Sequence, residues 1–578
     1  VVSLYDPDRL KKPRIRVEKD KDFHQRNWND VTYEKMDESL TKVIDGAKLG
    51  MLLASNPSPS RAGVVSDFAK TFSAQVYYDD SINHSEVRRG QELSYGDEVF
   101  PQYRFDKAKY IISLGADFLG TYANPTANAV SFAKTRQPGP DMSRLVVFEA
   151  LMSLTGANAD YRIRVKNSDL VKVAMGLAHE IVVKEGHSNY ANSDLVKSKL
   201  KEFANVAAEL NIEKELFSQI AKDIWEQRGK SLVVAGGINA KTEDALALQI
   251  SCNFLNTILE NDGKTVDYQN SLQAFQGSDA DVARLIADIE SGKIDTLLVS
   301  GVNPVYQHPE NKKLLQALKK VTLIYSTMYM DETAEMADYI LAESHPLEEW
   351  GDAEYLPGMY NIQQPTIRPI GDTRSIGFNL MTWAYFLEKG PARLNELESW
   401  YDYVRWTWKN RLNALSGDFE RSWVALLQAG FVDTKESQRE RDFTARRFRM
   451  DALSQVKKSN TKSSNYELSL YQKSAIGDGA MANMPWLQEM PDPVTKNTWE
   501  NYLTISYATA KKEKLKDGDI VSLEVDGKKL KVPVFVQIGQ EDSTLGLAVG
   551  YGHSWGKVAK GLGVNAWNLA KMTRDEMV

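Results

Sequence analysis

The sequence predicts a doubly wound α/β protein that ends in a small β-barrel. Short runs of apolar residues recur along the chain, and each lies beside a stretch with the apolar spacing of a helix. The runs are apolar throughout instead of alternating, which is typical of parallel strands covered by helices on both faces. After residue 500 the pattern changes to short strands between glycine turns. The predicted buried strands are residues 49–55, 74–78, 110–114, 145–148, 231–235, 296–299 and 323–326.

Composition places the chain among folded proteins and excludes two classes of function. Its 578 residues are too many for one hydrophobic core, so we expect two to four domains. Apolar residues make up 42% and charged residues 26%, with both signs interspersed. The net charge of -7 provides no basic face for nucleic acid. No run approaches the roughly 20 apolar residues that span a bilayer, so we expect neither a nucleic-acid partner nor a direct membrane span.

The chain lacks the residue sets of the common metal centres. Cys252 is the single cysteine, which excludes an internal disulfide and any cluster or zinc site built from several thiolates. It lies in an apolar helical pattern and is predicted to be a buried structural thiol. The seven histidines show neither a pair on one helix face nor a CxxCH motif for haem attachment. His345, close to Glu348, Glu349 and Asp352, is predicted to order a loop.

Three further segments have their own character. Residues 1–45 are polar and charged, and are predicted to form an extended lead-in that wraps another domain. Residues 376–500 are predicted to be a helical connection rich in tryptophan and tyrosine. At helical spacing such rings are more typical of a core or a subunit interface than of a stacking platform for bases. In 501–578 the predicted barrel strands are residues 504–506, 520–525, 530–536 and 546–549.

Several predicted strands run directly into glycine-containing turns, at 115–117, 236–239 and 301–304. Ligands of open α/β sheets bind beyond the carboxyl ends of the strands, where glycine lets the backbone approach a phosphate. The alternative is a tight strand-to-helix turn capped by Asn or Asp. We favour the structural interpretation for each turn, because none matches a full GxGxxG fingerprint or a P-loop.

Seven short motifs follow one another across nearly the whole chain. They are LYDPDR at 4–9, LTGANADYR at 154–162, GKTV at 263–266, GVNP at 301–304, EWGDA at 349–353, LKDGD at 515–519 and GLGVNA at 561–566. In this order they resemble the molybdopterin oxidoreductase family, and the order makes an accidental likeness improbable. More narrowly, they resemble the large subunit of alternative complex III, a bacterial quinol:electron-acceptor oxidoreductase.

The resemblance implies a specific architecture. Two doubly wound, mainly parallel α/β domains would share a crevice, with one domain inserted in the other. The first would comprise residues 46–85 and 305–375, with an accessory β segment near 346–370, and the inserted one residues 86–304. The C-terminal part, 501–578, would be a double-psi β-barrel that closes over the crevice.

The chain also departs from the family pattern at the places where chemistry would occur. Catalytic members carry a four-cysteine cluster site near the N-terminus and a Cys, Ser, selenocysteine or Asp ligand to molybdenum. Here the cluster site is missing, and the corresponding ligand segment, 79–85, contains no cysteine. Ser81, Ser85 or an Asp remains a possible metal ligand, but a polar turn explains the same residues and is the favoured interpretation.

We therefore predict no catalytic, cofactor-binding or metal-binding residue in this chain. The crevice residues Gly115, Asp117, Gly301 and Asn303 would be vestiges of a nucleotide site, retained as turn residues and caps. Ser81 would be the metal ligand only if the chain were active. Iron–sulfur clusters and c-type haems are expected in the continuation of the chain or in partner subunits.

The resemblance favours a structural, non-catalytic subunit of alternative complex III. That complex would oxidise quinol and reduce cytochrome c or a similar acceptor, and this chain would support its electron-transfer subunits. The expected partners are haem c subunits, an iron–sulfur domain and integral membrane quinol-binding subunits. The expected location is the periplasmic side of the bacterial inner membrane. No signal peptide is visible at Val1, so we expect the native start to lie upstream.

Two alternatives belong to different classes of function. One is an active molybdenum or tungsten bis-pterin oxidoreductase that acts on a small oxyanion or sulfur compound, with Ser81 or a nearby group as ligand. The other is a regulatory protein that binds a nucleotide in the crevice alone. Bound metal would indicate the first alternative, and a nucleotide without metal the second.

Overall fold

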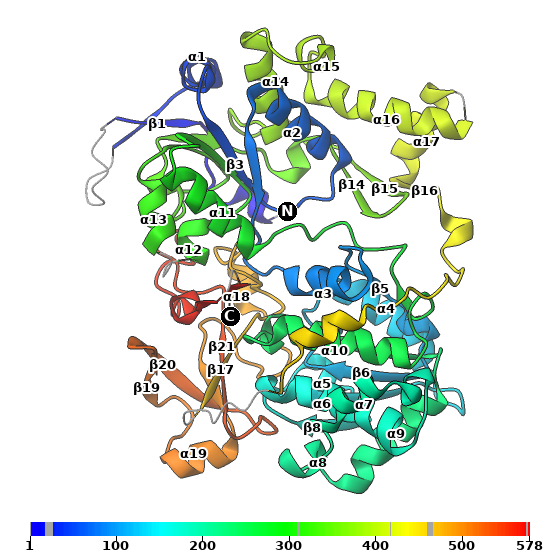
Figure 1. Cartoon of the computed structure of the whole chain (residues 1–578). Coiled ribbons are helices and arrows are strands. Elements are labelled where there is room, and N and C mark those ends of the chain that lie inside the picture. The colour runs from blue at the N-terminus through cyan, green and yellow to red at the C-terminus, as the bar shows by residue number, and fades with distance from the viewer. Residues whose placement is uncertain are drawn as a thin grey trace.

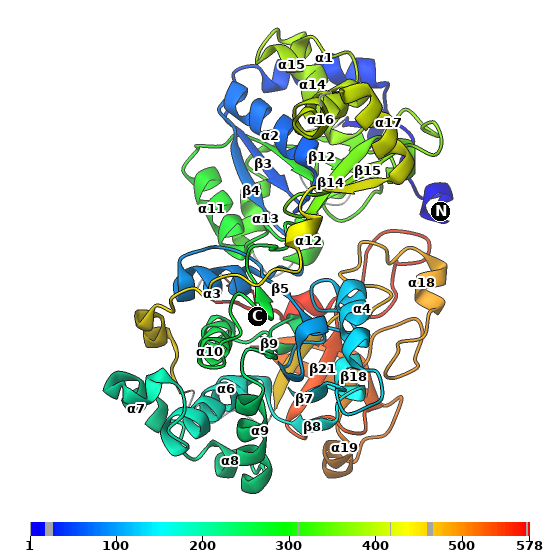
Figure 2. The ribbon, with the colours of Figure 1, turned by 90° about the vertical axis from the view of Figure 1, so that its right-hand side faces the viewer.

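A computed structural model describes residues 2–17, 27–308, 312–416, 418–458, 466–573 and 576–577. The chain forms two α/β domains and a C-terminal β domain that lies beside the inserted one (Figures 1 and 2). The mixed α/β architecture with parallel sheets is as predicted. Within the described ranges, none of the helices combines the length and apolar character that crossing a bilayer requires.

The first domain is built on a seven-stranded sheet whose central strands are parallel. Its core strands are fully buried because helices cover both faces. Helices α1 (Tyr33–Ile44) and α2 (Pro59–Phe72) cover one face, and α11 (Asp279–Glu290) and α13 (Lys312–Leu318) the other. The strands in spatial order are β2 (Trp28–Asp30), β1 (Arg14–Arg16), β13 (Tyr339–Ala342), β12 (Thr322–Thr327), β11 (Thr296–Ser300), β3 (Leu49–Leu53) and β4 (Gln75–Tyr78).

The inserted domain has a four-stranded, wholly parallel sheet. One face packs against α6 (Leu170–His179), α9 (Lys214–Glu226) and α10 (Ala245–Ile258), and Cys252 of α10 is buried as predicted. The other face carries an aromatic cluster that includes Phe132 of α4 (Pro125–Thr135). The strands in spatial order are β8 (Tyr161–Arg164), β7 (Arg144–Glu149), β6 (Tyr110–Leu114) and β9 (Ser231–Ala235).

The position of β11 shows that the predicted domain boundary at residue 304 is wrong. This strand lies in the first sheet, where Leu298 is in register with Met51 of β3 and Ile324 of β12. Helix α11 packs on the same sheet, so the inserted domain runs from α3 (Ser85–Tyr95) to the turn before residue 279. The apolar sequence of β11 would suit a buried strand of either sheet. Only its pairing with β3 and β12 shows that it belongs to the first sheet.

The predicted extended lead-in, 1–45, is also only partly extended. Strand β1 pairs antiparallel with β13, and residues 33–44 form α1 instead of an extended segment. Tyr33, Met36 and Leu40 lie on one face of this helix and are buried against the sheet. Their spacing is the apolar stripe of an amphipathic helix.

A continuous series of helices follows the first domain as far as residue 429, and among the described residues from there to 500 only short helical segments occur, such as α18 (Pro485–Glu489). Helices α14 (Ile376–Phe386), α15 (Ala392–Asn395), α16 (Trp400–Ser416) and α17 (Phe419–Ala429) pack beside a β hairpin. Trp383, Tyr403 and Trp408 are buried core residues. Beyond Ala429 the prediction of a helical connection to residue 500 is wrong, because the chain there is mostly irregular. The hairpin strands are β14 (Gly351–Leu356) and β15 (Met359–Gln363). Strand β16 (Phe431–Asp433) pairs antiparallel with β15 as the third strand of this sheet.

The C-terminal domain contains a five-stranded mixed sheet. Its first strand, β17, lies inside the segment predicted as the helical connection, so this domain begins before residue 501. Closure of the sheet into a double-psi barrel stays a prediction. The strands in spatial order are β17 (Glu467–Tyr471), β21 (Thr544–Ala548), β18 (Leu503–Ile505), β20 (Lys528–Val536) and β19 (Ile520–Val525).

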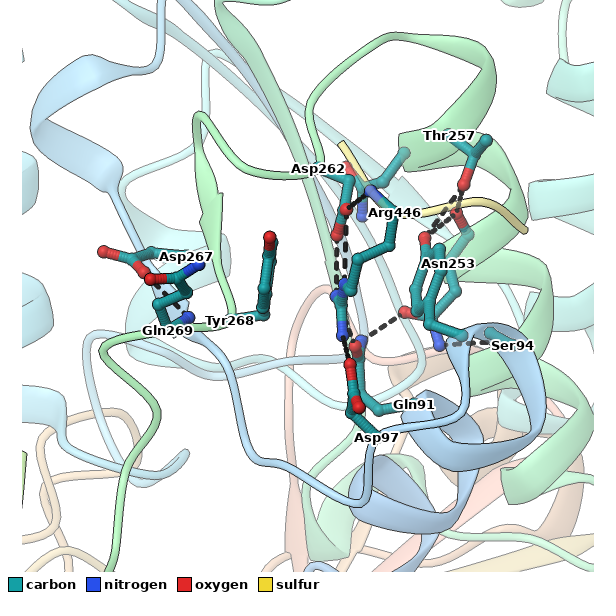
Figure 3. Close-up of polar contacts among 12 residues, drawn as sticks. Gln91, Ser94, Asp97, Asn253, Thr257, Asp262, Asp267, Tyr268, Gln269 and Arg446 are labelled. Carbon is teal, nitrogen blue, oxygen red and sulfur yellow. Dashed lines mark hydrogen bonds and ion pairs between the residues drawn. The ribbon is translucent and has the colours of Figure 1, made fainter. Parts of the chain in front are cut away.

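Residues 434–456 form a strap that leaves β16 and crosses the inserted domain, drawn in yellow in Figures 1 and 2. Its main anchor is Arg446, whose guanidinium forms an ion pair with Asp262 at 2.7 Å and donates to Gln91 Oε1 (Figure 3). The same guanidinium lies 4.1 Å from the Tyr95 ring centroid and 4.0 Å from that of Tyr268. The side chain of Arg446 is 9% exposed and that of Asp262 is 2% exposed.

We expect Arg446→Ala to destabilise the protein by about 3–5 kcal/mol, because the buried Asp262 carboxylate would lose its countercharge. Arg446→Lys should fall between that variant and the wild type, since an ammonium cannot form the bidentate pair. Urea unfolding followed by tryptophan fluorescence measures both. The exposed neighbour supplies the control, and Arg447→Ala should change stability by no more than about 0.5 kcal/mol. Equal losses for Arg446→Ala and Arg447→Ala would contradict the anchor.

Candidate functional site

The strand order of each α/β sheet identifies where a ligand would bind. In the first sheet the chain adds β4 on one side of β3 and then β11 on the other side, so the order of strand addition across this parallel sheet reverses between β3 and β11. Sheets of this kind bind ligands beyond the strand ends at that point. A cavity of about 350 Å³ lies there. The polar residues that line this cavity are Ser55, Asp80, Ser81, Gln307, Gln472 and Asp478. The backbone of Gly301 lines it as well.

The second sheet has an equivalent point between β6 and β9, with a much smaller cavity of about 60 Å³. Asp117 and Asn239 line it from the sheet, and Tyr471 and Gln540 from the C-terminal domain. Gln472 lines this cavity and the larger one, so the two lie on either side of it. Of the four predicted crevice residues, Asp117 lines the smaller cavity and Gly301 the larger one, whereas Gly115 and Asn303 line neither.

Asp117 and Asn303 both fix loops of this chain, but Asn303, at the N-cap position of the helix Pro304–Gln307, makes no side-chain cap hydrogen bond. Asp117 is 7% exposed, and its Oδ1 accepts from Thr155 N at 2.9 Å and Thr155 Oγ1 at 2.8 Å. Burial raises the pKa of this carboxyl. Asn303 Oδ1 accepts from Thr333 Oγ1 at 2.7 Å, while its Nδ2 donates to Glu332 Oε2 at 2.8 Å. Both side chains thus fix loops of this chain.

The two crevice glycines are required by internal packing. Gly301 has φ +79°, and a Cβ on it would lie 2.9 Å from Ala54 Cβ. Gly115 has φ +74°, and its Cβ would lie 2.5 Å from Ala240 Cβ. A side chain is excluded at both positions by the backbone conformation and by the neighbouring strand end, without any ligand.

The candidate metal-ligand segment, 79–85, is held by hydrogen bonds within the chain. Ser81 is 6% exposed, and its Oγ donates to Asp478 Oδ2 at 2.7 Å. Asp79 Oδ2 lies 3.0 Å from His308 Nε2, and both of these side chains are buried. Among the described residues, no group of three or more His, Cys, Asp or Glu side chains is arranged to hold a metal ion.

Asp80 joins the two ends of the insertion. Its carboxylate accepts from Ser55 N and Gly277 N, each at 3.0 Å, and from Ser55 Oγ. Asp80 lies where the chain leaves the first domain, and Gly277 lies where it returns. Burial without a cationic partner raises the pKa of the Asp80 carboxyl to about 6.

His84 belongs to an aromatic cluster and not to a catalytic pair. Its ring meets those of Phe100, Tyr122 and Phe275 edge-on, with centroid distances of 5.4, 5.3 and 4.9 Å. Burial lowers its pKa to about 3, so the imidazole is neutral at physiological pH. Tyr122 also covers the glycine turn after β9, because a Cβ on Gly237 would lie 3.3 Å from its ring.

The predicted loop role of His345 agrees with its contacts. Its Nδ1 accepts from Leu347 N at 3.1 Å, and Glu348 Oε2 accepts from His345 N at 2.9 Å, which together make a capping box. Arg9 pairs with the Glu348 carboxylate from the N-terminal segment. The cluster therefore fixes a loop to the start of the chain.

The sequence interpretation missed several residues that line the cavities and carry a buried side-chain atom with no hydrogen-bond partner among the described residues. The atoms are Gln307 Oε1 for the larger cavity, and Asn239 Oδ1, Gln537 Oε1 and Gln540 Oε1 for the smaller one. The smaller cavity suits one or two ordered waters, which need two to four polar partners each. Only Gln307 had a signal in the sequence, because Pro304 starts a short helix that turns the next residues back toward the strand ends.

Known proteins resemble this chain over most of its length. A family model described as molybdopterin oxidoreductase matches residues 9–376. The menaquinone reductase molybdopterin-binding-like subunit of Nitratidesulfovibrio vulgaris is 22% identical over 98% of this chain and 82% of that protein. The molybdopterin-containing subunit of an arsenate respiratory reductase from a Shewanella strain is 22% identical over 64% of this chain, and the match spans 53% of that protein.

A solved structure shows the same fold. Acetylene hydratase from Pelobacter acetylenicus superposes with a TM-score of 0.70, over 99% of this chain and 90% of that chain. The sequences are 12% identical, so this likeness concerns the fold alone. It extends through the C-terminal domain, beyond the part that the family model matches.

We expect the Asp80 carboxyl to stabilise the protein more as the pH falls. Its pKa is about 6 in the folded chain against an ordinary value of 3.8, so the folded state binds the proton more tightly. The contribution is complete below 3.8 and lost as the pH rises through 6. The unfolding free energy of wild type minus that of Asp80→Asn should rise by on the order of 2 kcal/mol between pH 8 and pH 4.

Urea unfolding at a series of pH values measures this difference. Glu500→Gln, at an exposed carboxyl, is the control and should show no comparable change over the same range. A pH-independent difference for Asp80→Asn would show that the carboxyl is not shifted.

Proposed function

Because this chain belongs to the molybdopterin oxidoreductase family, we propose that it is a non-catalytic, molybdoenzyme-like subunit of a respiratory quinone oxidoreductase complex. The observation that carries the proposal is the poor fit between the crevice and a pterin cofactor. The likeness to a subunit of a menaquinone reductase supports the assignment to a quinone-linked complex. Within that class, the motifs favour alternative complex III.

Neither sheet-edge cavity by itself offers enough space for a bis-pterin dinucleotide cofactor. Small-molecule sites of about 300–1,000 Å³ enclose a single drug-sized ligand, and two dinucleotides need more. The cavities at the two sheet edges measure about 350 and 60 Å³. Tyr122 covers the glycine turn after β9, where a dinucleotide would approach the backbone.

The side chains of the crevice do not fit the cofactor either. Asp117, which lines the smaller cavity, accepts hydrogen bonds from Thr155, and Asn303, which lines neither cavity, is bonded to Thr333 and Glu332. Ser81 donates its hydroxyl proton to Asp478. The described residues provide neither a free thiolate near these cavities nor a cluster of metal ligands. We therefore derive no reaction step from this site.

The proposed role is to support electron-transfer partners. Those partners would be subunits with c-type haems, an iron–sulfur domain and membrane subunits that bind quinol, and the electron acceptor would be cytochrome c or a similar carrier. The proposed location is the periplasmic side of the bacterial inner membrane, reached through partners. In this proposal the chain itself holds no cofactor.

An active molybdenum or tungsten oxidoreductase is the second candidate. The observation in its favour is that Ser81 lines the larger crevice cavity, on a turn where the family pattern places a metal ligand. The likeness to an arsenate respiratory reductase subunit supports it as well. Under this alternative Ser81 would be the protein ligand, and the substrate a small oxyanion or sulfur compound.

Elemental analysis of the native complex, with a fluorescence assay for oxidised pterin, separates the two functions. We expect far less than one molybdenum or tungsten per chain, and no pterin, because the crevice does not fit the cofactor. About one metal per chain together with pterin would overturn the non-catalytic proposal.

We also expect Ser81→Ala to leave quinol oxidation by the assembled complex within about twofold of wild type. Ser85→Ala, which removes the other candidate hydroxyl ligand from the same segment, should likewise leave the rate within about twofold of wild type. Size-exclusion chromatography establishes that the complex is assembled, and the rate is measured with a soluble quinol. A loss of a hundredfold or more for Ser81→Ala alone, with assembly intact, would assign a metal ligand to Ser81.

A further inference from the structure

One segment of the C-terminal domain exposes four large apolar side chains within residues 481–499. Trp486 is 71% exposed and Met490 50%, and Met481 and Trp499 are exposed as well. We call these four residues the Trp–Met surface. Helix α18, which belongs to this segment, lies at the edge of the molecule in Figure 2. Tryptophan and methionine are enriched where proteins meet, and a group of exposed apolar side chains marks an interaction site.

Hydrogen bonds of the buried Gln488 join the parts of the Trp–Met surface. Gln488 lies near the end of α18, between two of the four side chains in sequence. Its Nε2 donates to the carbonyl oxygen of Ala482, next to Met481, at 2.8 Å. Its own carbonyl oxygen accepts from Trp499 N at 2.8 Å. The four exposed side chains therefore lie on adjoining turns of the chain.

The same segment is packed against the domain from beneath. Ala482 belongs to a hydrophobic cluster with Ile476 and Tyr551, and Leu487 packs against that cluster. Met484 is buried as well. The segment thus places one set of apolar side chains in the core and a second set in solvent. A fixed apolar surface is suited to binding, because little conformational entropy is lost when a partner covers it.

The charges next to the Trp–Met surface are mainly negative. Glu489 and Glu500 are exposed, and each adjoins one of the four side chains in sequence. Within the described part of the chain neither carboxylate forms an ion pair. Lys496 is the only lysine or arginine of residues 481–500. The turn 556–560, which contacts this segment, carries two lysines, and one of them, Lys557, lies 3.7 Å from Asp8.

These charges distinguish between the molecules that could cover the surface. Two copies of this chain that met through the same surface would bring the carboxylates of both copies together, and like charges at an interface cost several kcal/mol. Anionic lipid headgroups attract basic segments and would repel Glu489 and Glu500. A protein that presents lysine or arginine beside an apolar patch would pair with both carboxylates and bury the four side chains.

We infer that the Trp–Met surface docks a partner subunit whose own surface is an apolar patch bordered by lysine or arginine. The inference rests on the proposed function, because it takes the chain to work within a complex. Trp486 would be the anchor, since a buried tryptophan at the centre of an interface carries much of the binding energy. Glu489 and Glu500 would orient the partner and speed its association.

Site-specific photo-crosslinking in the native complex tests the inference. The photoreactive amino acid p-benzoylphenylalanine replaces Trp486, and mass spectrometry identifies the cross-linked peptide. We expect a peptide of a different subunit, with lysine or arginine close to the cross-linked position. The same replacement at Tyr507, an exposed aromatic residue of α19 (Tyr507–Glu513), is the matched control and should not yield that peptide.

The outcomes separate the inference from the proposed function. A cross-link to lipid or to a second copy of this chain would overturn the inference. So would an intact complex without any cross-link at position 486. A chain that purifies without partners would overturn the proposed function as well. Metal and pterin in a complex that still yields the expected cross-link would overturn the non-catalytic proposal and leave the inference standing.

Charge reversal tests the role of the carboxylates. We expect Glu489→Lys combined with Glu500→Lys to lower the amount of partner that co-purifies with this chain at least tenfold, and Trp486→Ala to do the same. Glu185→Lys, at an exposed carboxylate of the inserted domain, is the matched control and should retain the partner. Thermal unfolding should show unchanged stability for all three, because the altered side chains are exposed. Full retention of the partner by folded Trp486→Ala would contradict the inference.

Discussion

The hydrogen bonds around Asp80 hold together the two ends of a long excursion of the chain. The inserted domain leaves after β4 and must return beside the same strand, because β11 has to fit between β3 and β12. Asp80 binds Ser55 and Gly277 across that junction. The carboxyl is buried without a cation, and this raises its pKa. The raised pKa of Asp80 could be taken for that of a catalytic acid, but its hydrogen bonds stabilise the junction between the two α/β domains.

Features that depend on local pattern could be predicted from the sequence. Strands 110–114 and 231–235 occur with the predicted limits, since continuous apolarity reports burial on both faces directly. The structural role of Asp117 followed from turn chemistry, whereas the bonds of Asn303 to Glu332 and Thr333 are not those of a helix cap. Membership of β11 in the first sheet could not be predicted, because it rests on pairing with strands far away in the sequence. Helix α1 had a visible signal, the spacing of Tyr33, Met36 and Leu40, which its many charges obscured.

The site was harder to predict than the fold. The volume of the smaller cavity depends on side chains from three parts of the chain, such as Asp117, Gln472 and Gln540, and no local sequence pattern predicts that they meet. Unpartnered atoms such as Trp567 Nε1 emerge only from the completed packing. A family fold can thus be recognised from motifs, while the space it encloses is decided by residues that carry no motif at all.

The strap anchored by Arg446 gives the two α/β domains a second connection, remote in sequence from the junction at Asp80. A domain attached at one point can rotate freely about that point, whereas a domain attached at two separated points can rotate only about the axis that joins them. The contacts at Asp80 and Arg446 therefore restrict rotation of the inserted domain relative to the first domain. Opening of the crevice would require release of a guanidinium enclosed by two tyrosine rings and a buried carboxylate. The distance between surfaces on opposite domains is therefore set by the fold itself.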